Sequence, residues 1–164
     1  MKKLVLVIVV FMGSFGIIKA QEIAPNAIGL RLGDSEGFGA SVSYQRAILE
    51  HNRLEFDLGW RNGRNLRGVK GVALFQWIKP LVNDFNWYFG AGGGLSSVTI
   101  DIRGTNDNVT DTFGFIAGDI GVEYHFDFPL LLSLDIRPEL GFGDDVYDND
   151  NLDFDVGVGV RYTF

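Results

Sequence analysis

The sequence predicts an all-β fold, an eight-stranded antiparallel up-and-down transmembrane β-barrel, from three observations. Glycine accounts for 22 of the 164 residues, which disfavours helix because an interior glycine costs about 1 kcal/mol relative to alanine. Alternation of apolar and polar residues with period two, typical of strands with two unlike faces, recurs along the chain. The segments between these stretches are alternately tighter and longer, as in a barrel of consecutive hairpins.

The first twenty residues have the pattern of a cleavable signal peptide. Lys2 and Lys3 give a positive start, an apolar run follows from Leu4 to Ile18, and Ala20 is a small residue suited to cleavage. A retained membrane helix is the alternative, but the apolar run is short of the roughly 20 residues that a helix needs to span a bilayer. We therefore expect export of the mature chain.

The mature chain, residues 21–164, has the length of one domain. Without residues 1–20 it keeps 11 basic and 21 acidic residues, so its net charge is about −10, which opposes binding to nucleic acid. Cysteine is absent, which excludes disulfides, thiolate metal sites and a cysteine nucleophile.

Four strands are predicted in the first half of the mature chain. The first three alternate apolar residues with small or charged ones, whereas the fourth is apolar on both faces. In chain order they are Ala27–Leu32, Phe38–Ile48, Arg53–Arg61 and Gly71–Ile78.

Four more strands are predicted in the second half. The first of them is rich in glycine and has Tyr88 on its polar side, and the last two alternate without a break in register except at Pro138. In chain order they are Asn86–Leu95, Ile116–Phe126, the stretch LLLSLDIRPELGF over 130–142, and Phe154–Phe164.

The connections fall into two sets that alternate along the chain. The tighter set is Leu49–Asn52, Lys79–Phe85 and Asp127–Leu130. The other set is Gly33–Gly37, Asn62–Lys70, Ser96–Thr112 and Gly143–Asn151, of which all but the first are longer. Since membrane barrels have short periplasmic turns and longer external loops, we expect the second set to face outward and both termini to lie on the periplasmic side.

Alternation alone does not tell which face of a closed sheet is wet, but the composition of the two faces does. The polar face combines small residues with arginine and carboxylates, which suits a narrow filled interior, and aromatic residues collect near strand ends, as in interfacial girdles. The predicted interior charges are Arg31, Glu55, Asp57, Asp119, Glu123, Asp135, Arg137, Glu139, Asp155 and Arg161. The alternative is an exported soluble lipocalin-like barrel that binds a small apolar ligand.

The sequence resembles the small outer-membrane barrels of the OmpA and OmpX kind. The resemblance rests on the signal peptide, the eight amphipathic strands and the terminal strand FDVGVGVRYTF. The stretch DIRPE at 135–139 is also similar to one in the penultimate strand of short uncharacterised Gram-negative outer-membrane barrel proteins. The aromatic end, Tyr162 and Phe164, is similar to the assembly signal read by the barrel-assembly machinery. The resemblance implies a monomer in the cell outer membrane, in contact with outer-membrane lipid and lipopolysaccharide, without the peptidoglycan-binding domain of the OmpA protein itself.

The interior charges are expected to form a hydrogen-bonded network that fills the lumen. A gate for a small pore is the alternative, which is disfavoured because eight strands leave an interior just wide enough for side chains. Hydrolysis of lipid is also disfavoured, since His51 and His125 are predicted at the periplasmic end and a nucleophile at the outer rim would lack a histidine base. No catalytic residue and no cofactor are predicted.

Two predicted outer loops are candidate contact sites. Asp144, Asp145, Asp148 and Asp150 offer hard oxygen ligands that could hold calcium or bridge to lipopolysaccharide, but they lack the spacing of a helix-loop-helix calcium site. A solvated acidic loop is the favoured interpretation. The Ser96–Thr112 loop is the expected place for a contact with an external partner.

Overall fold

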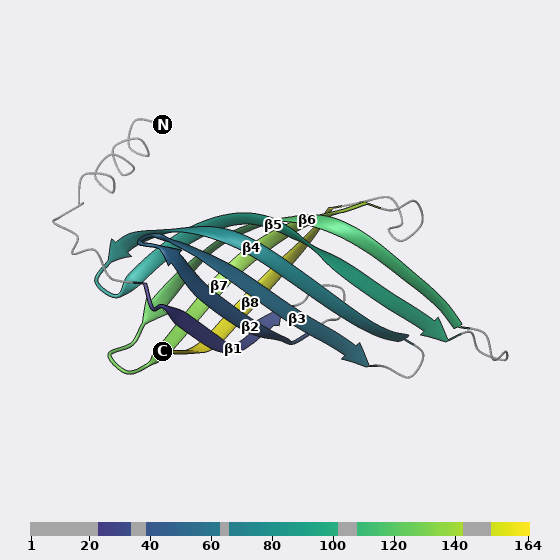
Figure 1. Ribbon diagram of the computed structural model, residues 1–164, viewed down its shortest axis with the longest axis horizontal. Helices are drawn as coiled ribbons and strands as arrows, with labels where there is room; N and C mark the ends of the chain where they lie inside the picture. Colours follow the sequence, from purple (N-terminus) through teal and green to yellow (C-terminus); the bar gives the residue numbers. More distant parts are fainter. Residues whose placement is uncertain (1–22, 34–38, 63–65, 102–107, 143–151) are drawn as a thin grey trace, which may run out of the picture.

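The computed structural model describes residues 23–33, 39–62, 66–101, 108–142 and 152–164, and these form one closed barrel (Figure 1). Its strands are β1 (Asn26–Gly33), β2 (Ser41–Leu49), β3 (Asn52–Asn62), β4 (Leu66–Val82), β5 (Phe85–Asp101), β6 (Asn108–His125), β7 (Leu130–Phe142) and β8 (Leu152–Thr163). Each strand pairs antiparallel with the next, and β1 pairs with β8. The predicted fold class and its eight strands are confirmed. Within these ranges no helix is long and apolar enough to cross a membrane.

The barrel closes where its first and last strands meet. Gly29 of β1 stands opposite Arg161 of β8, and the register runs unbroken from Ala27–Thr163 to Gly33–Gly157. Asn26 and Phe164 exchange backbone hydrogen bonds of 3.0 and 2.9 Å just beyond that register. The sheet in this seam therefore leaves no free edge.

The prediction of a long loop over Ser96–Thr112 is wrong. The structure continues β5 to Asp101 and begins β6 at Asn108, so these strands pair along most of the predicted loop. Cross-strand hydroxyl pairs, Ser97 with Thr112 and Thr99 with Thr110, hydrogen-bond at 3.0 Å. The sequence pattern missed this extension because its outward positions carry hydroxyls, so the apolar alternation stops although the strands do not.

The Asn62–Lys70 loop and the Lys79–Phe85 turn are also shorter than predicted. Strand β4 begins at Leu66 and ends at Val82, which leaves Asn83 and Asp84 as the turn before β5. Asn83 adopts a left-handed backbone conformation with φ of 50°, which asparagine tolerates better than most residues. The missed residues at the two ends of this strand include Lys70, Lys79 and Pro80, where charge and proline interrupt the apolar run although the strand continues.

The short turns lie at one end of the barrel, the left-hand end in Figure 1. They join β2 to β3, β4 to β5 and β6 to β7. At the other end β6 extends beyond β7, since the pairing of these two strands stops at Gly114–Phe142. The pairing of β5 with β6 continues farther, to Asp101–Asn108. We call the end with the short turns the turn end and the opposite end the loop end.

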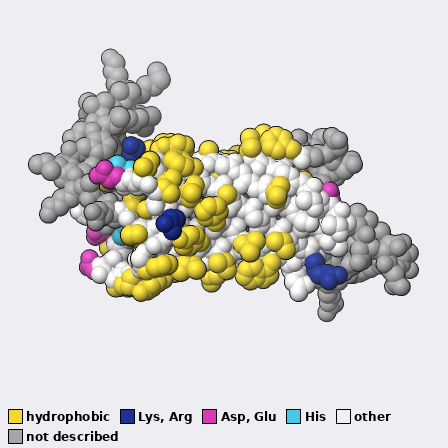
Figure 2. Space-filling view, viewed as in Figure 1, with side chains coloured by type: hydrophobic (Ala, Val, Ile, Leu, Met, Phe, Trp, Pro, Cys, Tyr) yellow, Lys and Arg dark blue, Asp and Glu magenta, His cyan; other side chains and the backbone are white. Residues whose placement is uncertain are grey.

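The exterior of the barrel is apolar and its interior is polar. Leu30 and Val156 are 50% and 52% exposed, whereas Glu55 and Arg161 are 1% exposed. Figure 2 shows hydrophobic side chains along the length of the barrel and acidic side chains at its ends. A lipocalin-like barrel has the reverse arrangement, with apolar residues around a central ligand. The outward-facing apolar surface predicted from the alternation is therefore present.

Aromatic rings form a belt near the turn end. Trp77 stacks on Phe89 with centroids 5.3 Å apart, and Tyr124 meets Phe126 edge to face at 4.7 Å. The rings of Tyr162 and Phe164 stack at 6.2 Å on the same end. Trp60 and Phe154 are exposed toward the loop end, so aromatic residues mark both ends of the apolar band, as the girdles of membrane barrels do.

Candidate functional site in the barrel interior

All ten charged residues predicted for the lumen are buried, each with at most 5% of its surface exposed. Strand alternation explains this placement, because every second residue of a barrel strand points inward. The side chains join across the barrel into four groups, one at the centre and the others toward the two ends.

Glu55 lies at the centre of the interior. Its Oε1 accepts a hydrogen bond from Nη2 of Arg137 at 3.0 Å and lies 3.3 Å from Nη2 of Arg161. Its Oε2 accepts hydrogen bonds from the amides of Gln45 at 2.5 Å and Gln76 at 3.2 Å. Both carboxylate oxygens thus have partners, which is what a buried charge requires to be tolerated.

The two central arginines also bind side chains other than Glu55. Arg137 donates from Nη1 to Oδ2 of Asp57 at 2.8 Å, and its Nε lies 3.9 Å from Oδ1 of Asp119. Arg161 donates to the hydroxyls of Ser43 at 2.9 Å and Ser133 at 2.7 Å. The central group therefore ties β2, β3, β7 and β8 together across the lumen.

Arg31 organises the group on the loop-end side of the centre. It donates from Nε to Oδ1 of Asp135 at 2.9 Å and from Nη1 to Oδ2 of Asp155 at 2.5 Å. The hydroxyl of Tyr88 reaches the other oxygen of Asp135 at 3.5 Å. One arginine thus bridges β7 and β8 from β1, on the inner side of the closing seam.

Arg53 organises the group near the turn end. Its Nη1 lies 2.6 Å from Oε2 of Glu123, and its Nε donates to Oε1 of Gln76 at 2.6 Å. The guanidinium also lies over the ring of Tyr88, 4.9 Å from its centroid. His125 contacts the other oxygen of Glu123 through Nε2 at 3.1 Å.

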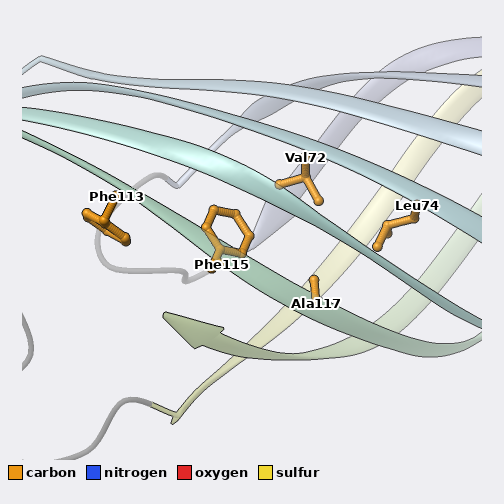
Figure 3. Packing of buried hydrophobic residues seen from close by; sticks show 5 residues of the cluster. All are labelled: Val72, Leu74, Phe113, Phe115 and Ala117. Carbon is orange, nitrogen blue, oxygen red and sulfur yellow. The ribbon is translucent and has the colours of Figure 1, made fainter. Parts of the chain in front are cut away.

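The fourth group lies toward the loop end and joins a salt bridge to an apolar cluster. Lys70 of β4 forms a hydrogen-bonded ion pair with Glu139 of β7, and its ammonium lies 4.8 Å from the ring centroid of Phe115. The cluster comprises Val72, Leu74, Phe113, Phe115 and Ala117 from β4 and β6 (Figure 3). This part of the lumen is therefore filled by hydrophobic as well as charged side chains.

Several interior residues were not predicted. Arg53 shares the inward parity of Glu55 and Asp57, so the alternation could have identified it. Lys70 was missed because it was placed in a loop, and Gln76 because its strand reads as apolar on both faces. These three side chains bind predicted interior acids or bridge between them.

The interior is tightly filled and carries an excess of acid. In the described part of the chain seven buried carboxylates face five buried Arg and Lys side chains. A cavity of about 20 Å³ remains among Arg31, Asp57, Arg137, Glu139 and Asp155, which is room for about one water molecule. The described charged side chains therefore leave little space around these five residues.

The remaining predicted residues lie outside this interior. Asp144, Asp145, Asp148 and Asp150 fall outside the described residues, and within the described ranges no group of His, Asp or Glu is placed to hold a metal ion. Tyr162 and Phe164 are exposed on the exterior, at 56% and 58%. His51 lies in the β2–β3 turn and His125 ends β6, so both are at the turn end.

Comparison with protein-family models and with curated proteins finds no match. Among solved structures, the N-terminal β-barrel domain of Pseudomonas aeruginosa OprF has a TM-score of 0.67 at 14% identity, over 88% of this chain and 100% of that one. Neisserial surface protein A has a TM-score of 0.60 at 17% identity, over 85% and 94% of the two chains. Ail, the attachment invasion locus protein of Yersinia pestis, has a TM-score of 0.53 at 12% identity, over 85% and 96%.

These likenesses concern the fold. The neighbours are small eight-stranded outer-membrane barrels, and the present chain shares their strand number and closed antiparallel order. The predicted resemblance to barrels of the OmpA and OmpX kind is confirmed at this level: the chain has the fold of a small outer-membrane β-barrel.

Proposed function

We propose that this protein is a monomeric, non-enzymatic integral protein of the outer membrane, with a structural or surface-interaction role. The observation that carries the proposal is the polarity of the barrel, in which leucines and valines face outward and charged side chains are buried. In water this arrangement would expose the apolar exterior to solvent, and each Å² of exposed apolar surface would cost about 25 cal/mol of free energy. Lipid removes that penalty.

The filled interior supports a structural role over transport. Ion pairs and hydrogen bonds connect strands on opposite sides of the lumen, for example Lys70 with Glu139 and Arg137 with Asp57. The cavity among these side chains has room for about one water molecule, which favours a closed interior over an open channel. The network therefore acts as an internal brace that holds the barrel closed.

The absence of enzymatic activity is part of the proposal. Acyl transfer needs a nucleophile, a base and an orienting group within hydrogen-bond reach. His51 and His125 lie at the turn end, which is the periplasmic end by analogy with other membrane barrels. At the loop end the described hydroxyls of Ser97 and Thr99 bond to threonines rather than to a base.

The proposed partners follow from this placement. The apolar belt contacts outer-membrane lipid, the loop end contacts lipopolysaccharide, and the barrel-assembly machinery contacts the chain during insertion through Tyr162 and Phe164. The acidic net charge opposes a nucleic-acid partner. The hydroxyl-bearing extension of β5 and β6 is the described surface that projects farthest for a contact outside the cell.

Membrane fractionation tests the placement. The protein should resist extraction by carbonate, dissolve in detergent, and migrate faster on a gel before boiling than after it, because the closed barrel stays folded in cold detergent. Release by carbonate together with heat-independent migration would contradict the proposal and favour a soluble barrel with an apolar ligand.

Recordings in planar lipid bilayers test the closed interior. The folded protein should give no steady conductance, since the lumen is filled. A reproducible open conductance in the wild-type protein would overturn the structural interpretation of the network and leave the membrane placement intact.

A further inference from the structure

The charges of the central group do not balance. Three buried carboxylates, those of Glu55, Asp57 and Asp119, lie beside two guanidinium groups, those of Arg137 and Arg161. The group therefore carries one excess negative charge when every carboxylate is ionised. A buried charge without a partner is costly in free energy, and a carboxyl group avoids this cost by binding a proton.

Asp119 is the carboxylate that lacks a close cation. In the described part of the chain, each of the other six buried carboxylates lies within 3.0 Å of an Arg or Lys nitrogen. For Asp119 the nearest such nitrogen is Nε of Arg137, which lies 3.9 Å from Oδ1 and is too far away for a hydrogen bond. Neither of these two atoms has a hydrogen-bond partner among the described residues. The excess charge therefore falls on Asp119.

The strand pairing explains why Arg137 does not approach more closely. Asp119 of β6 and Arg137 of β7 occupy facing positions, but on β7 the backbone pairing with β6 is interrupted between Glu139 and Ile136. Pro138 lies within this gap and has no N–H group to donate. The two Nη atoms of Arg137 point instead across the lumen, where they donate to the two acids of β3. Only the Nε side of the guanidinium is left for Asp119.

The other groups that face Asp119 do not replace a cation. The amide of Gln76 on β4 donates a hydrogen bond to its Oδ2. Glu55 on β3 and Asp135 on β7 act on it as negative charges, and Tyr88 on β5 is a further titratable neighbour. Like charges nearby raise the cost of one more negative charge at this position.

The group around Arg31 also has one acid in excess, but there both acids bind the cation directly. Arg31 donates from Nε and Nη2 to Asp135 and from Nη1 to Asp155. The hydroxyl of Tyr88 lies 3.5 Å from the second oxygen of Asp135. Because each of these carboxylates is held as an ion by a guanidinium, the proton is expected on Asp119 instead.

We propose that the folded barrel binds one proton at neutral pH and that the carboxyl group of Asp119 holds it. The proton is taken up from water as the barrel folds, converts the carboxylate to a neutral acid, and brings the central group to a net charge of zero. Release of the proton at alkaline pH returns the excess negative charge and weakens the internal brace. The inference deepens the proposed role of the interior as a brace and rests on that role.

A metal ion fits this position less well than a proton. Within the described ranges no group of His, Asp or Glu is placed to hold a metal ion. The cavity of about 20 Å³ next to the central group is lined by three cationic side chains, Arg31, Lys70 and Arg137, as well as by acids. A proton needs neither a set of ligands nor a cavity.

Infrared spectroscopy detects such a proton directly. A protonated carboxyl group has a C=O stretching band that is separate from the bands of carboxylates and backbone amides. Full-length wild-type protein, folded in lipid vesicles, should show this band at neutral pH, and Asp119→Asn should lose it. Asp127→Asn, which changes an exposed acid in the turn between β6 and β7, is the matched control and should keep it.

The pH dependence of unfolding gives a second measurement. An aspartate in the unfolded chain releases its proton near about pH 4, whereas the folded barrel keeps the proton to neutral pH. The folded state then binds one proton more than the unfolded state, so stability falls as the pH rises over this interval. Relative to Asp119→Asn, the unfolding equilibrium constant of the wild-type protein should rise by up to about tenfold per pH unit between about pH 5 and pH 7. Asp127→Asn should keep the slope of the wild type.

The outcomes separate this inference from the proposed function. Folded wild-type protein without the band, or a band that persists in Asp119→Asn, would overturn the proton site while heat-modifiable migration upheld the membrane barrel. A difference between the wild type and Asp119→Asn that is the same at every pH would show a packing role only and would also overturn it. Loss of the band on addition of sodium chloride would assign the site to a cation. A conducting wild-type lumen would instead overturn the filled interior on which the site depends.

Discussion

Arg137 and Glu55 are 82 positions apart in the chain, yet their side chains meet in the middle of the barrel at 3.0 Å. They lie on β7 and β3, which are not neighbours in the sheet, so the contact crosses the lumen. Both side chains are almost fully buried. Removing one partner of such a pair leaves an uncompensated buried charge, which is strongly destabilising.

Neutralising the central carboxylate should therefore destabilise the barrel. Glu55→Gln removes the charge between Arg137 and Arg161, and we expect the free energy of unfolding to fall by about 3–5 kcal/mol. Denaturant titration of the protein in lipid vesicles measures this change. A loss under about 1 kcal/mol would mean that the network does not brace the barrel.

Asp119→Asn is the matched comparison and should be much milder. Asp119 reaches Arg137 only at 3.9 Å, and the interior already holds more carboxylates than cations. Asparagine has nearly the size and shape of the neutral carboxyl group inferred above, so we expect a change within about 1 kcal/mol in the same titration at neutral pH. Equal destabilisation by both variants would contradict the central position of Glu55.

An arginine on the lipid-facing surface should destabilise the inserted barrel. Val156 of β8 is 52% exposed and faces outward, between the buried Asp155 and Gly157. Val156→Arg should lower the free energy of unfolding in vesicles by about 2–4 kcal/mol, as charged residues near the bilayer midplane do. Val156→Leu is the control. A loss under about 0.5 kcal/mol for the arginine variant would show that this face does not meet lipid.

Two strand glycines should respond differently to alanine. At Gly29 a Cβ would lie 2.0 Å from the carbonyl oxygen of Val160 across the closing seam, whereas at Gly71 it would meet nothing within 4 Å. Gly29→Ala should destabilise by about 1–3 kcal/mol or more, because the paired backbone must shift. Gly71→Ala should lie within about 0.5 kcal/mol of wild type. Similar values for the two variants would contradict the close approach at the seam.

The aromatic C-terminus should matter more for assembly than for stability. Phe164 is 58% exposed, and its pairing with Asn26 uses backbone atoms. Phe164→Ala should reduce the amount of folded barrel in cell membranes, while the purified variant, refolded in vesicles, should keep its unfolding free energy within about 1 kcal/mol of wild type. Normal cellular assembly would contradict an assembly signal at this residue, and Phe164→Tyr serves as the conservative control.

The sequence predicts the strands well where one face meets lipid and the other the lumen. The alternation from Phe154 to Tyr162 identifies β8, and the interior position of Arg161 follows from the same parity. The alternation is lost where the two faces have similar residues. Beyond Leu95 the outward residues of β5 are the polar Ser97 and Thr99, and in β4 an inward residue, Leu74, is apolar.

The partners of the interior side chains are not accessible from the strand pattern. Alternation places Glu139 inside the barrel, and it does the same for Lys70 once its strand is recognised. It does not show that β4 and β7 face each other across the lumen. That depends on barrel closure and on the stagger between strands. The pairing of small outward-facing residues, Ala73 with Gly93, likewise depends on the register between β4 and β5.

The hydrogen bonds between Asn26 and Phe164 join the first and last described residues that pair in the sheet. Until β8 is in place, β1 has no partner on one side, and an unpaired strand edge invites association with other chains. The barrel therefore closes only when β8 joins β1. The same proximity of the ends predicts that a circularly permuted gene, with Asn26 and Phe164 joined by a brief linker, would encode the same cylinder.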